Sequence, residues 1–303
     1  MSVWPRVLVT GADGQVGRAL LATLAGSAEV IPCNRNSLDL SNPDQIRSTV
    51  REIAPDIIIN AGAYTAVDRA ESERELAFAI NGHAPGVLAE EAQRASSLLI
   101  HYSTDYVFNG SKKGPWVEED ATDPLNVYGA SKLAGEEAIR KAGGRYLIFR
   151  TSWVYAPEGK NFLLTMLRLG RERNSLNVVD DQIGAPTTAS ELARATQAIA
   201  TQISDGKFAE PDAWAGTYHM TCAGSVSWCG FARAIFQRSP NLLDGKKPTV
   251  NPISASEYPT PAKRPRNSVL SNEKLQRTFG VHLASWESAL DEVLTEIAAK
   301  RKA

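Results

Sequence analysis

The 303-residue chain has few cysteines and histidines, and their positions exclude the common frameworks built on them. Cys33, Cys222 and Cys229 are odd in number and form no C-x-x-C pair, so we predict neither a disulfide framework nor a zinc site. The four histidines are scattered, which argues against a histidine-based metal site. Isolated thiols fit a reducing compartment, and we expect a cytoplasmic protein.

Long apolar runs and a strong charge of one sign are also missing. No apolar segment approaches the roughly 20 residues that cross a bilayer, and the first residues do not have the layout of a signal peptide. The formal net charge is -1, which gives no bulk attraction to nucleic acid or to an anionic membrane. We therefore expect neither of these as a partner.

The first half of the chain alternates short apolar runs with amphipathic stretches. This alternation predicts an α/β fold, a Rossmann-like doubly wound parallel sheet with helices on both faces. The expected strands lie near 6–10, 29–32, 56–60, 97–102 and 146–150. One helix is expected to follow the first strand and to run through residue 24, a second to begin at about residue 42, and a third to cover about 73–95. A fourth carries Tyr128 and Lys132.

After residue 150 the pattern loosens, and proline-rich pieces separate shorter elements. We predict a smaller C-terminal substrate-binding lobe over the carboxyl ends of the strands, where ligands bind in open α/β sheets. The predicted boundaries are 1–175 and 188–222 for the nucleotide-binding domain, and 176–187 and 223–303 for the substrate-binding lobe. In this half, helices are expected near 161–172, 189–203, 227–237 and 285–300, and strands near 176–179, 216–221 and 248–252.

Three glycines stand between the first predicted strand and the first predicted helix. Gly11, Gly14 and Gly17 form G-x-x-G-x-x-G, which permits a tight turn and a close approach of backbone N–H groups to a diphosphate. An ordinary glycine-rich turn is the alternative, but the position at the first strand–helix junction favours a dinucleotide site.

The segment after the second strand bears on the choice of cofactor. An acidic residue there would bind the ribose 2′-hydroxyl and repel a 2′-phosphate, but 33–36 contains no carboxylate. Arg35 can pair with a 2′-phosphate, although it can equally be an exposed loop arginine. We favour NADPH and keep NADH open.

Tyr128 and Lys132 are spaced i, i+4 on a predicted helix, so they share one face. A neighbouring cation favours the phenolate, and we expect Lys132 to lower the pKa of Tyr128 toward the working range. Thr104 lies in the run 101–108 at the C-terminal end of the fourth predicted strand, and its hydroxyl is suited to bind a carbonyl oxygen that becomes an alkoxide. Together the three residues predict a catalytic set for ketone reduction.

With these motifs the chain resembles the dTDP-4-dehydrorhamnose reductases, a subfamily of the extended short-chain dehydrogenase/reductase superfamily. The resemblance covers almost the whole chain, including the predicted substrate half. The matching runs are 14–17, 63–68, 101–108, 124–129, 149–155, 181–187 and 258–262, with Arg264, Pro265, Asn267 and Ser268.

The resemblance implies the last step of dTDP-L-rhamnose synthesis, which supplies rhamnose for surface polysaccharides such as lipopolysaccharide. Hydride from NADPH or NADH would reduce the C4 ketone of dTDP-4-dehydro-6-deoxy-L-mannose, and Tyr128 would donate the proton. The catalytic residues implied are Thr104, Tyr128 and Lys132. The cofactor-binding residues implied are Gly11, Asp13, Gly14, Gln15, Val16, Asn34, Arg35, Asp39, Leu40, Ala61, Gly62, Ala63, Tyr64, Tyr128 and Lys132. The substrate-binding residues implied are Val67, Thr104, Asp105, Tyr106, Tyr128 and Trp153.

Cations and glutamates of the C-terminal half leave further possibilities open. Lys263, Arg264 and Arg266 are candidates for the diphosphate of the sugar nucleotide, or form a solvated basic loop. Some family members bind Mg²⁺ through C-terminal glutamates at a dimer interface, so Mg²⁺ and a homodimer stay open, and no metal ligand is assigned. The glutamates in question are Glu191, Glu287 and Glu296.

Three other functions compete with this one. A nucleotide-sugar dehydratase or epimerase of the superfamily carries Asp-Glu after the strand-end threonine, whereas Tyr106 follows Asp105 here. A non-catalytic subunit, like the β subunit of methionine adenosyltransferase, need not keep Thr104, Tyr128 and Lys132 together. A reductase of another 4-keto sugar nucleotide would keep all of these residues.

Overall fold

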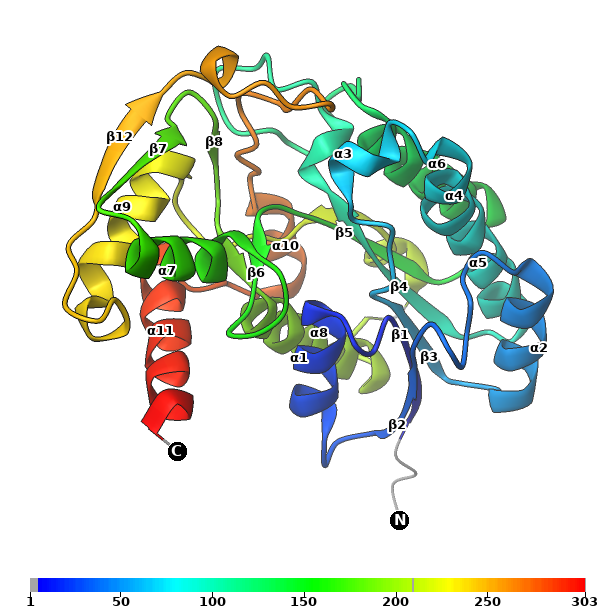
Figure 1. Cartoon of the computed structure of the whole chain (residues 1–303). Helices are drawn as coiled ribbons and strands as arrows, with labels where there is room; N and C mark the ends of the chain where they lie inside the picture. The colour runs from blue at the N-terminus through cyan, green and yellow to red at the C-terminus, as the bar shows by residue number, and fades with distance from the viewer. Residues whose placement is uncertain (1–4, 209, 303) are drawn as a thin grey trace.

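The computed structural model describes residues 5–208 and 210–302, and Figure 1 shows their arrangement. Residues 1–4, 209 and 303, which the predicted domains include, lie outside the described residues. A six-stranded sheet has the order β10-β5-β4-β3-β1-β2, and every neighbouring pair in it is parallel. Its strands are β1 (Arg6–Thr10), β2 (Glu29–Cys33), β3 (Ile57–Asn60), β4 (Leu98–Thr104), β5 (Tyr146–Thr151) and β10 (Gly216–His219).

The prediction of a doubly wound parallel sheet is confirmed. β3 and β4 are buried along their whole length, as expected of strands covered on both faces. Helices α1 and α8 cover one face, and helices α2, α5 and α6 cover the other (Figure 1). Their apolar side chains pack against those of the strands. These helices are α1 (Gln15–Leu24), α2 (Pro43–Ile53), α5 (Ala84–Arg94), α6 (Val127–Ala142) and α8 (Ala189–Ser204).

Helix α6 is held closely against its neighbours. Asn126 caps its N-terminus by accepting a 2.8 Å hydrogen bond from the N–H of Gly129. A Cβ at Gly135 would lie 2.1 Å from the carbonyl oxygen of Asn81, so only glycine permits this approach. The first two turns of α6, which carry Tyr128 and Lys132, are therefore fixed in position.

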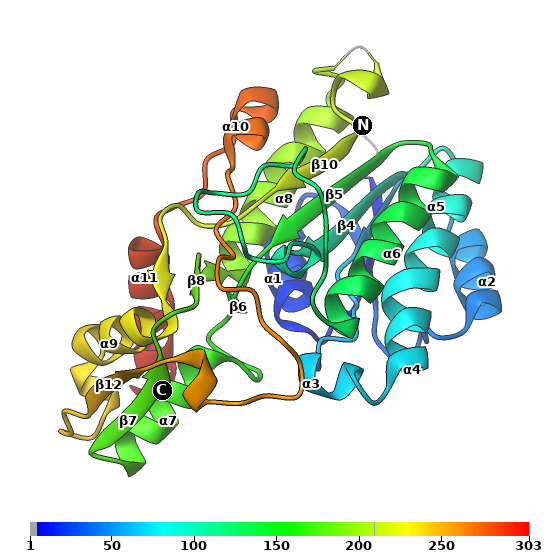
Figure 2. The same cartoon turned by 90° about the horizontal axis from the view of Figure 1, so that it is seen from above.

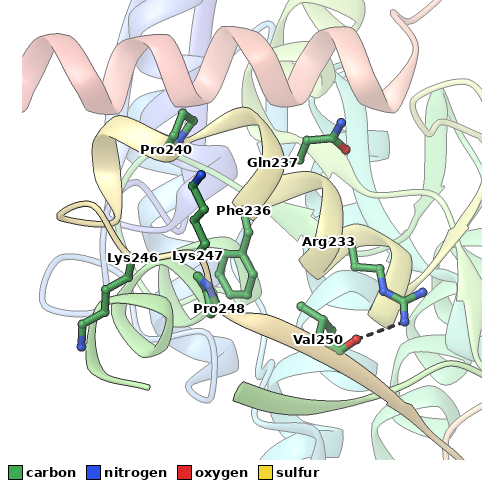
Figure 3. Close-up of a pocket in the computed structure, with 8 residues that line it drawn as sticks. All are labelled: Arg233, Phe236, Gln237, Pro240, Lys246, Lys247, Pro248 and Val250. Carbon is green, nitrogen blue, oxygen red and sulfur yellow. Dashed lines mark hydrogen bonds between the residues drawn. The ribbon is translucent and has the colours of Figure 1, made fainter. Parts of the chain in front are cut away.

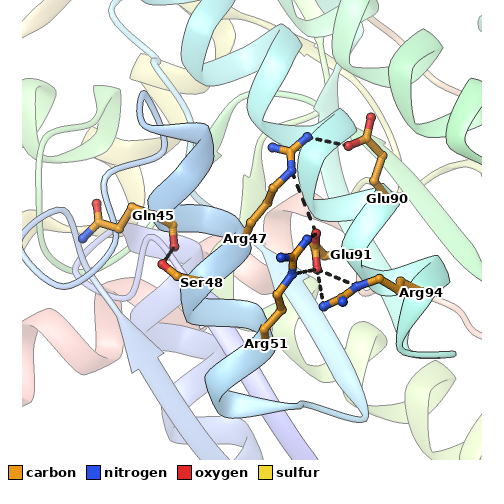
Figure 4. A network of polar contacts seen from close by, with 7 residues as sticks. All are labelled: Gln45, Arg47, Ser48, Arg51, Glu90, Glu91 and Arg94. Carbon is orange, nitrogen blue, oxygen red and sulfur yellow. Dashed lines mark hydrogen bonds and ion pairs between the residues drawn. The ribbon is translucent and has the colours of Figure 1, made fainter.

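Helices α2 and α5 are joined by ion pairs around one buried carboxylate (Figure 4). Glu91 accepts hydrogen bonds from Arg51 at 2.7 and 2.9 Å and pairs with Arg94 at 2.8 Å. Arg47 pairs with Glu90 at 2.8 Å. None of these five residues lines the large cavity described below, so the network stabilises the packing of the two helices.

A second core lies beside the sheet and its helices, in the part that contains α7, α9 and α11 (Figures 1 and 2). The parallel strands β7 and β12 pack there with these helices. Helix α7 lies within the predicted range 1–175 but packs in this second core; the domain boundaries stay a prediction. The elements are α7 (Phe162–Glu172), β7 (Ser175–Val179), α9 (Trp228–Arg238), β12 (Thr249–Ile253) and α11 (Trp286–Lys302).

Short elements complete the described chain. The single helix expected near 73–95 is broken into α4, one π-helical turn and α5, a feature often found at functional sites. Within residues 5–208 and 210–302, no helix is both long and apolar enough to cross a membrane. The remaining strands are β6 (Val154–Tyr155), β8 (Ile183–Gly184), β9 (Thr187–Thr188) and β11 (Val226–Ser227). The remaining helices are α3 (Val67–Ala70), α4 (Arg74–Phe78), η1 (Ala79–His83), η2 (Asp105–Val107), η3 (Pro211–Ala213), η4 (Pro240–Leu242), η5 (Ala255–Glu257) and α10 (Glu273–Phe279).

Candidate functional site

A cavity of about 760 Å³ opens at the carboxyl ends of the central strands. Residues that follow β1, β2 and β3 line one part of it, and residues of β4, α6 and the end of β5 line another. Trp228, at the start of α9, reaches it from the second core. This is where ligands bind in doubly wound folds.

The glycine loop has the geometry of an anion site. Gly11 has φ +64°, and a Cβ there would lie 2.6 Å from backbone atoms of Gly62. A Cβ at Gly17 would lie 2.2 Å from the carbonyl oxygen of Gly11. Helix α1 begins after Gly14 with no side-chain cap and no acidic residue in its first turn, so its N–H groups and dipole can serve a phosphate.

The loop after β2 forms the adjoining wall. Asn34 turns this loop by accepting hydrogen bonds at Oδ1 from the N–H groups of Asn36 and Ser37. Asp39 accepts from the N–H and hydroxyl of Ser41, and these hydrogen bonds lower the pKa of its carboxyl. Arg35 is exposed at the cavity, where its guanidinium can reach a phosphate.

Thr104 and Tyr128 meet at the end of β4. Both side chains line the cavity, and the Thr104 hydroxyl is near enough to lower the pKa of the Tyr128 phenol. The Thr104 hydroxyl also donates to Asp105 Oδ1 at 3.0 Å and accepts from the N–H of Tyr106 at 3.2 Å. A carbonyl oxygen placed beside Tyr128 would thus meet two hydroxyl groups, as the reduction of a ketone requires.

The amine of Lys132 has different partners. Its Nζ donates a 2.6 Å hydrogen bond to the carbonyl oxygen of Tyr102 and lies 3.2 Å from Nε2 of His101. The side chain is almost entirely buried, and burial lowers the pKa of the amine to about 8, although the charge of Glu136 acts in the opposite direction.

The pKa of Tyr128 is raised, not lowered. Burial raises this pKa to about 12, and the charge of Asp105 acts in the same direction. The hydrogen-bonding effect of Thr104 lowers the pKa but offsets only part of the increase. The prediction that Lys132 lowers this pKa is therefore wrong, because the Lys132 amine binds the Tyr102 carbonyl and burial of the phenol dominates. The phenol is consequently fully protonated at neutral pH and available as a proton donor.

Asp105 has free hydrogen-bonding capacity. It is 3% exposed, and its Oδ2 atom has no partner among the described residues. Burial raises the pKa of the carboxyl to about 6, although hydrogen bonds from Ser268 and Thr104 act against this shift. A buried acceptor of this kind points to a ligand that brings a donor, such as a sugar hydroxyl.

An aromatic wall closes the other side of the cavity. Trp153 has φ +49°, in the left-handed region that a bulky residue adopts at a cost. Its indole stacks on that of Trp228 with ring centroids 3.4 Å apart and planes within 7°. A Cβ at Gly184 would lie 2.5 Å from the Trp153 ring, so glycine is required behind it.

Nearly all residues predicted for the site line this one cavity. The exception is Tyr64, whose N–H donates to Asn81 and whose hydroxyl donates to Glu73 at 2.5 Å. The lining residues that were predicted are Gly11, Asp13, Gly14, Gln15, Val16, Asn34, Arg35, Asp39, Leu40, Ala61, Gly62, Ala63, Val67, Thr104, Asp105, Tyr106, Tyr128, Lys132 and Trp153. Those that sequence reasoning missed include Leu38, Thr65, Ile80, Ser152, Lys160 and Trp228.

The basic loop near residue 264 lies outside the lining of the cavity. Arg264 pairs with Asp68 at 2.8 Å, and Asn126 donates to the carbonyl oxygen of Lys263 at 2.7 Å. These contacts fasten the loop to the first turn of α3 and to the start of α6. Contact of Lys263, Arg264 and Arg266 with a diphosphate stays a prediction.

A smaller cavity of about 340 Å³ lies between α9, the loop after it and β12 (Figure 3). Arg233 at its edge donates to the carbonyl oxygen of Val250 at 3.0 Å. The lysines beside it, Lys246 and Lys247, are exposed. Over the described part of the chain, no group of three or more His, Cys, Asp or Glu residues is placed to hold a metal ion.

Comparisons with known proteins agree with this geometry. The model of the family described as RmlD substrate binding domain matches residues 5–299. A dTDP-4-dehydrorhamnose reductase of Burkholderia thailandensis is 48% identical over 94% of this chain and 96% of that protein. The reductase of the same name from Escherichia coli K12 is 45% identical over 96% of this chain and 97% of that protein.

A solved structure also matches along almost the whole chain. The crystal structure of a dTDP-4-dehydrorhamnose reductase from Bacillus anthracis, in complex with NADP, superposes with a TM-score of 0.88 at 38% identity. The match covers 97% of this chain and 100% of that one. The chain therefore belongs to the RmlD substrate binding domain family, together with these dTDP-4-dehydrorhamnose reductases.

Proposed function

We propose that the chain reduces the C4 ketone of dTDP-4-dehydro-L-rhamnose to give dTDP-L-rhamnose, with NADPH as the preferred hydride donor and NADH as a second one. The observation that carries this proposal is the meeting of Thr104 and Tyr128 in the cavity that also contains the glycine loop. The names of the relatives support the substrate, and the NADP complex of the Bacillus anthracis protein supports the cofactor. The product would supply rhamnose for surface polysaccharides.

The residues present fit a dinucleotide. The uncapped N-terminus of α1 and the crowded backbone at Gly11 and Gly62 suit a diphosphate lying on the loop. Arg35 would pair with a 2′-phosphate, and Lys132 would bind the nicotinamide ribose. Bound NADPH supplies the hydride.

Within the site, the protein's own groups hold the ketone and supply the proton. Tyr128 would donate a hydrogen bond to the C4 oxygen, and Thr104 would turn its single hydrogen from Asp105 to the same oxygen, which polarises the carbonyl. As negative charge develops on this oxygen, the phenol of Tyr128 transfers its proton, because an alkoxide is a stronger base than a phenolate.

The substrate half would orient the sugar. Asp105 offers its unpartnered Oδ2 to a sugar hydroxyl, and Trp153 offers a flat apolar surface. Tyr106 and Val67 line the same part of the cavity. A dehydratase is disfavoured because it needs a second carboxyl group after Asp105, where this chain has Tyr106.

A cytoplasmic location is part of the proposal. Cys33, Cys222 and Cys229 are free and buried, as expected of a protein that folds in a reducing compartment. Whether the chain forms a homodimer stays a prediction.

The direct test is to mix the purified protein with NADPH and enzymatically prepared dTDP-4-dehydro-L-rhamnose and to follow the absorbance of NADPH. Oxidation that depends on the sugar nucleotide supports the proposal. Its absence, with and without Mg²⁺, in a protein that still binds NADPH would point to a non-catalytic subunit.

A further inference from the structure

Three buried polar side chains form a row across the central sheet. Thr10 pairs with Asn60 where β1 meets β3, and Asn60 pairs with His101 where β3 meets β4. Each of the three residues is only 1% exposed. Polar groups in an apolar sheet are costly unless they are hydrogen-bonded, and here each side chain is bonded to the next.

The row runs from the glycine-loop region to Lys132. The N–H of Gly62 donates to Thr10 Oγ1 at 3.2 Å, and the Thr10 hydroxyl donates to Asn60 Oδ1 at 2.6 Å. Asn60 Nδ2 lies 2.9 Å from Nδ1 of His101. The other ring nitrogen of His101, Nε2, lies 3.2 Å from Nζ of Lys132.

The direction of these hydrogen bonds follows from a donor that cannot change. The backbone N–H of Gly62 always donates, so Thr10 accepts there and directs its single hydrogen to Asn60 Oδ1. The amide of Asn60 must then donate to His101 Nδ1. Burial and the charge of Lys132 hold the pKa of His101 well below its usual value, so the ring is neutral. A neutral ring that accepts at Nδ1 carries its hydrogen on Nε2, facing Lys132.

The opposite arrangement leaves a hydrogen unsatisfied. A Lys132 ammonium that donates to His101 Nε2 requires the ring hydrogen on Nδ1 and a turned Asn60 amide. Thr10 would then accept from both Gly62 and Asn60, and its own hydrogen would have no acceptor among the described residues. A buried donor without an acceptor is costly, so the row makes it easier for the Lys132 ammonium to lose its proton and favours the neutral amine once the pH exceeds about 8.

We infer that Thr10, Asn60 and His101 are positioning residues that hold the amine of Lys132 and couple its charge to the tautomer of His101. The inference deepens the proposed reductase site and rests on that function for its kinetic test alone. Other charged groups near Lys132 are already engaged or lie at the cavity, and the test leaves them unchanged. Glu136 of α6 is bound by Arg150 of β5 and by Arg140 of α6. Asp105, which follows β4, and Tyr128 of α6 line the cavity.

The tautomer can be observed without substrate. Protein labelled with ¹⁵N in its four histidines would be measured by NMR at about pH 9, and a His101→Gln variant would assign the His101 signals. We expect a neutral ring protonated at Nε2. In an Asn60→Asp variant, the carboxylate accepts from Nδ1, and the ring hydrogen moves there. A ring protonated at Nδ1 in the unaltered protein would overturn the inference, whatever the reductase activity.

The kinetic test uses the same Asn60→Asp change. A His101 ring protonated at Nδ1 has a lone pair at Nε2, which accepts a hydrogen bond from the ammonium of Lys132 and raises the pKa of Lys132. The basic limb of the kcat/KM profile should therefore move to higher pH by about one unit. Thr196→Val is the matched control, because it removes the 2.6 Å hydrogen bond to the Tyr102 hydroxyl on the opposite face of the sheet. Thr196→Val should lower the stability of the protein and leave the pH of the basic limb of the kcat/KM profile unchanged. An unmoved limb in a folded Asn60→Asp protein would contradict the inference.

Discussion

Tyr128 and Lys132 lie one turn apart in α6, yet their polar groups bind different partners. The phenol lies beside the Thr104 hydroxyl in the cavity, whereas the amine donates to the carbonyl oxygen of Tyr102 at 2.6 Å. Their proton affinities are therefore set separately, with a pKa of about 12 for the phenol and about 8 for the amine. Both groups carry their protons at neutral pH, the state that a ketone reduction needs.

The first prediction concerns the proton donor. Tyr128→Phe removes the phenolic hydrogen and should lower kcat by roughly 10²–10⁴-fold, while NADPH binding, measured by fluorescence titration, changes little. Tyr218→Phe is a suitable control, because it removes a 2.7 Å hydrogen bond from a buried tyrosine hydroxyl to the Trp214 carbonyl, away from the cavity. Normal turnover by Tyr128→Phe would refute its role as the acid.

The second prediction is the pH profile of kcat/KM, which reports groups of the free enzyme. Lys132 loses its positive charge as the pH rises through about 8, which should weaken its hydrogen bond to the nicotinamide ribose, so activity should fall there. Asp105 gains a proton as the pH falls through about 6, so the binding of a sugar hydroxyl should weaken below that value. In Asp105→Asn the acidic limb should disappear. An acidic limb that persists in this variant would assign it to another group.

Cofactor preference supplies a third prediction. Arg35→Ser removes the partner of the 2′-phosphate and should weaken NADPH binding roughly tenfold or more, with NADH binding unchanged. Arg47→Ser is the control, since Arg47 pairs with Glu90 and does not line the cavity. Equal losses for both cofactors, measured by titration, would show that Arg35 does not read the 2′-phosphate.

The indole pair allows a fourth prediction. Trp228→Leu removes the ring that backs Trp153 and should raise the KM for the sugar nucleotide roughly fivefold, the order of one aromatic contact. The KM for NADPH should stay the same, because Trp228 belongs to the opposite lobe from the glycine loop. An unchanged KM for the sugar nucleotide would remove Trp228 from the binding wall.

The fifth prediction tests a buried ion pair behind the site. Glu136 is fully buried and binds Arg150 through two hydrogen bonds of 2.9 and 2.7 Å. Glu136→Gln leaves the Arg150 charge without its partner and should lower the free energy of unfolding by roughly 3–5 kcal/mol. An exposed control, Glu172→Gln, breaks the pair with Arg168 and should change it by less than about 1 kcal/mol. Urea denaturation measures both.

The stability that the Glu136–Arg150 pair contributes depends on pH. Burial alone would raise the pKa of Glu136, but the hydrogen bonds and charge of Arg150 outweigh it and lower that pKa. A carboxyl group whose pKa is lower in the folded than in the unfolded protein stabilises the fold at pH values above its unfolded pKa. This stabilisation is lost as the pH falls through its folded pKa. Glu136→Gln should lack this loss on the acid side. An identical acid-side decline in both proteins would contradict the assignment.

The sheet and its cofactor loop could be predicted because their signals are local. Continuous apolar runs such as 57–59 indicate strands buried on both faces, and Gly11, Gly14 and Gly17 follow the first of them directly. The carboxyl ends of parallel strands meet at one edge, which brings Thr104 to the same cavity as the loop.

The rest depended on packing that no local pattern shows. Trp228 reaches the cavity only because the second core places α9 against Trp153. Tyr64 lies in a run typical of the family, but its backbone and hydroxyl are bound by Asn81 and Glu73. The row that ends at His101 depends on strand register, and the raised pKa of Tyr128 depends on burial, so neither could be predicted from spacing.

The central claim, hydride reduction of a sugar C4 ketone, is tested most directly by following a label. The protein would be incubated with dTDP-4-dehydro-L-rhamnose and NADPH deuterated at C4 of the nicotinamide, on either face, and the product examined by NMR. We predict dTDP-L-rhamnose with deuterium at C4 of the sugar from one of the two labelled cofactors. Unchanged substrate, or a product without deuterium at C4 from either cofactor, would contradict it.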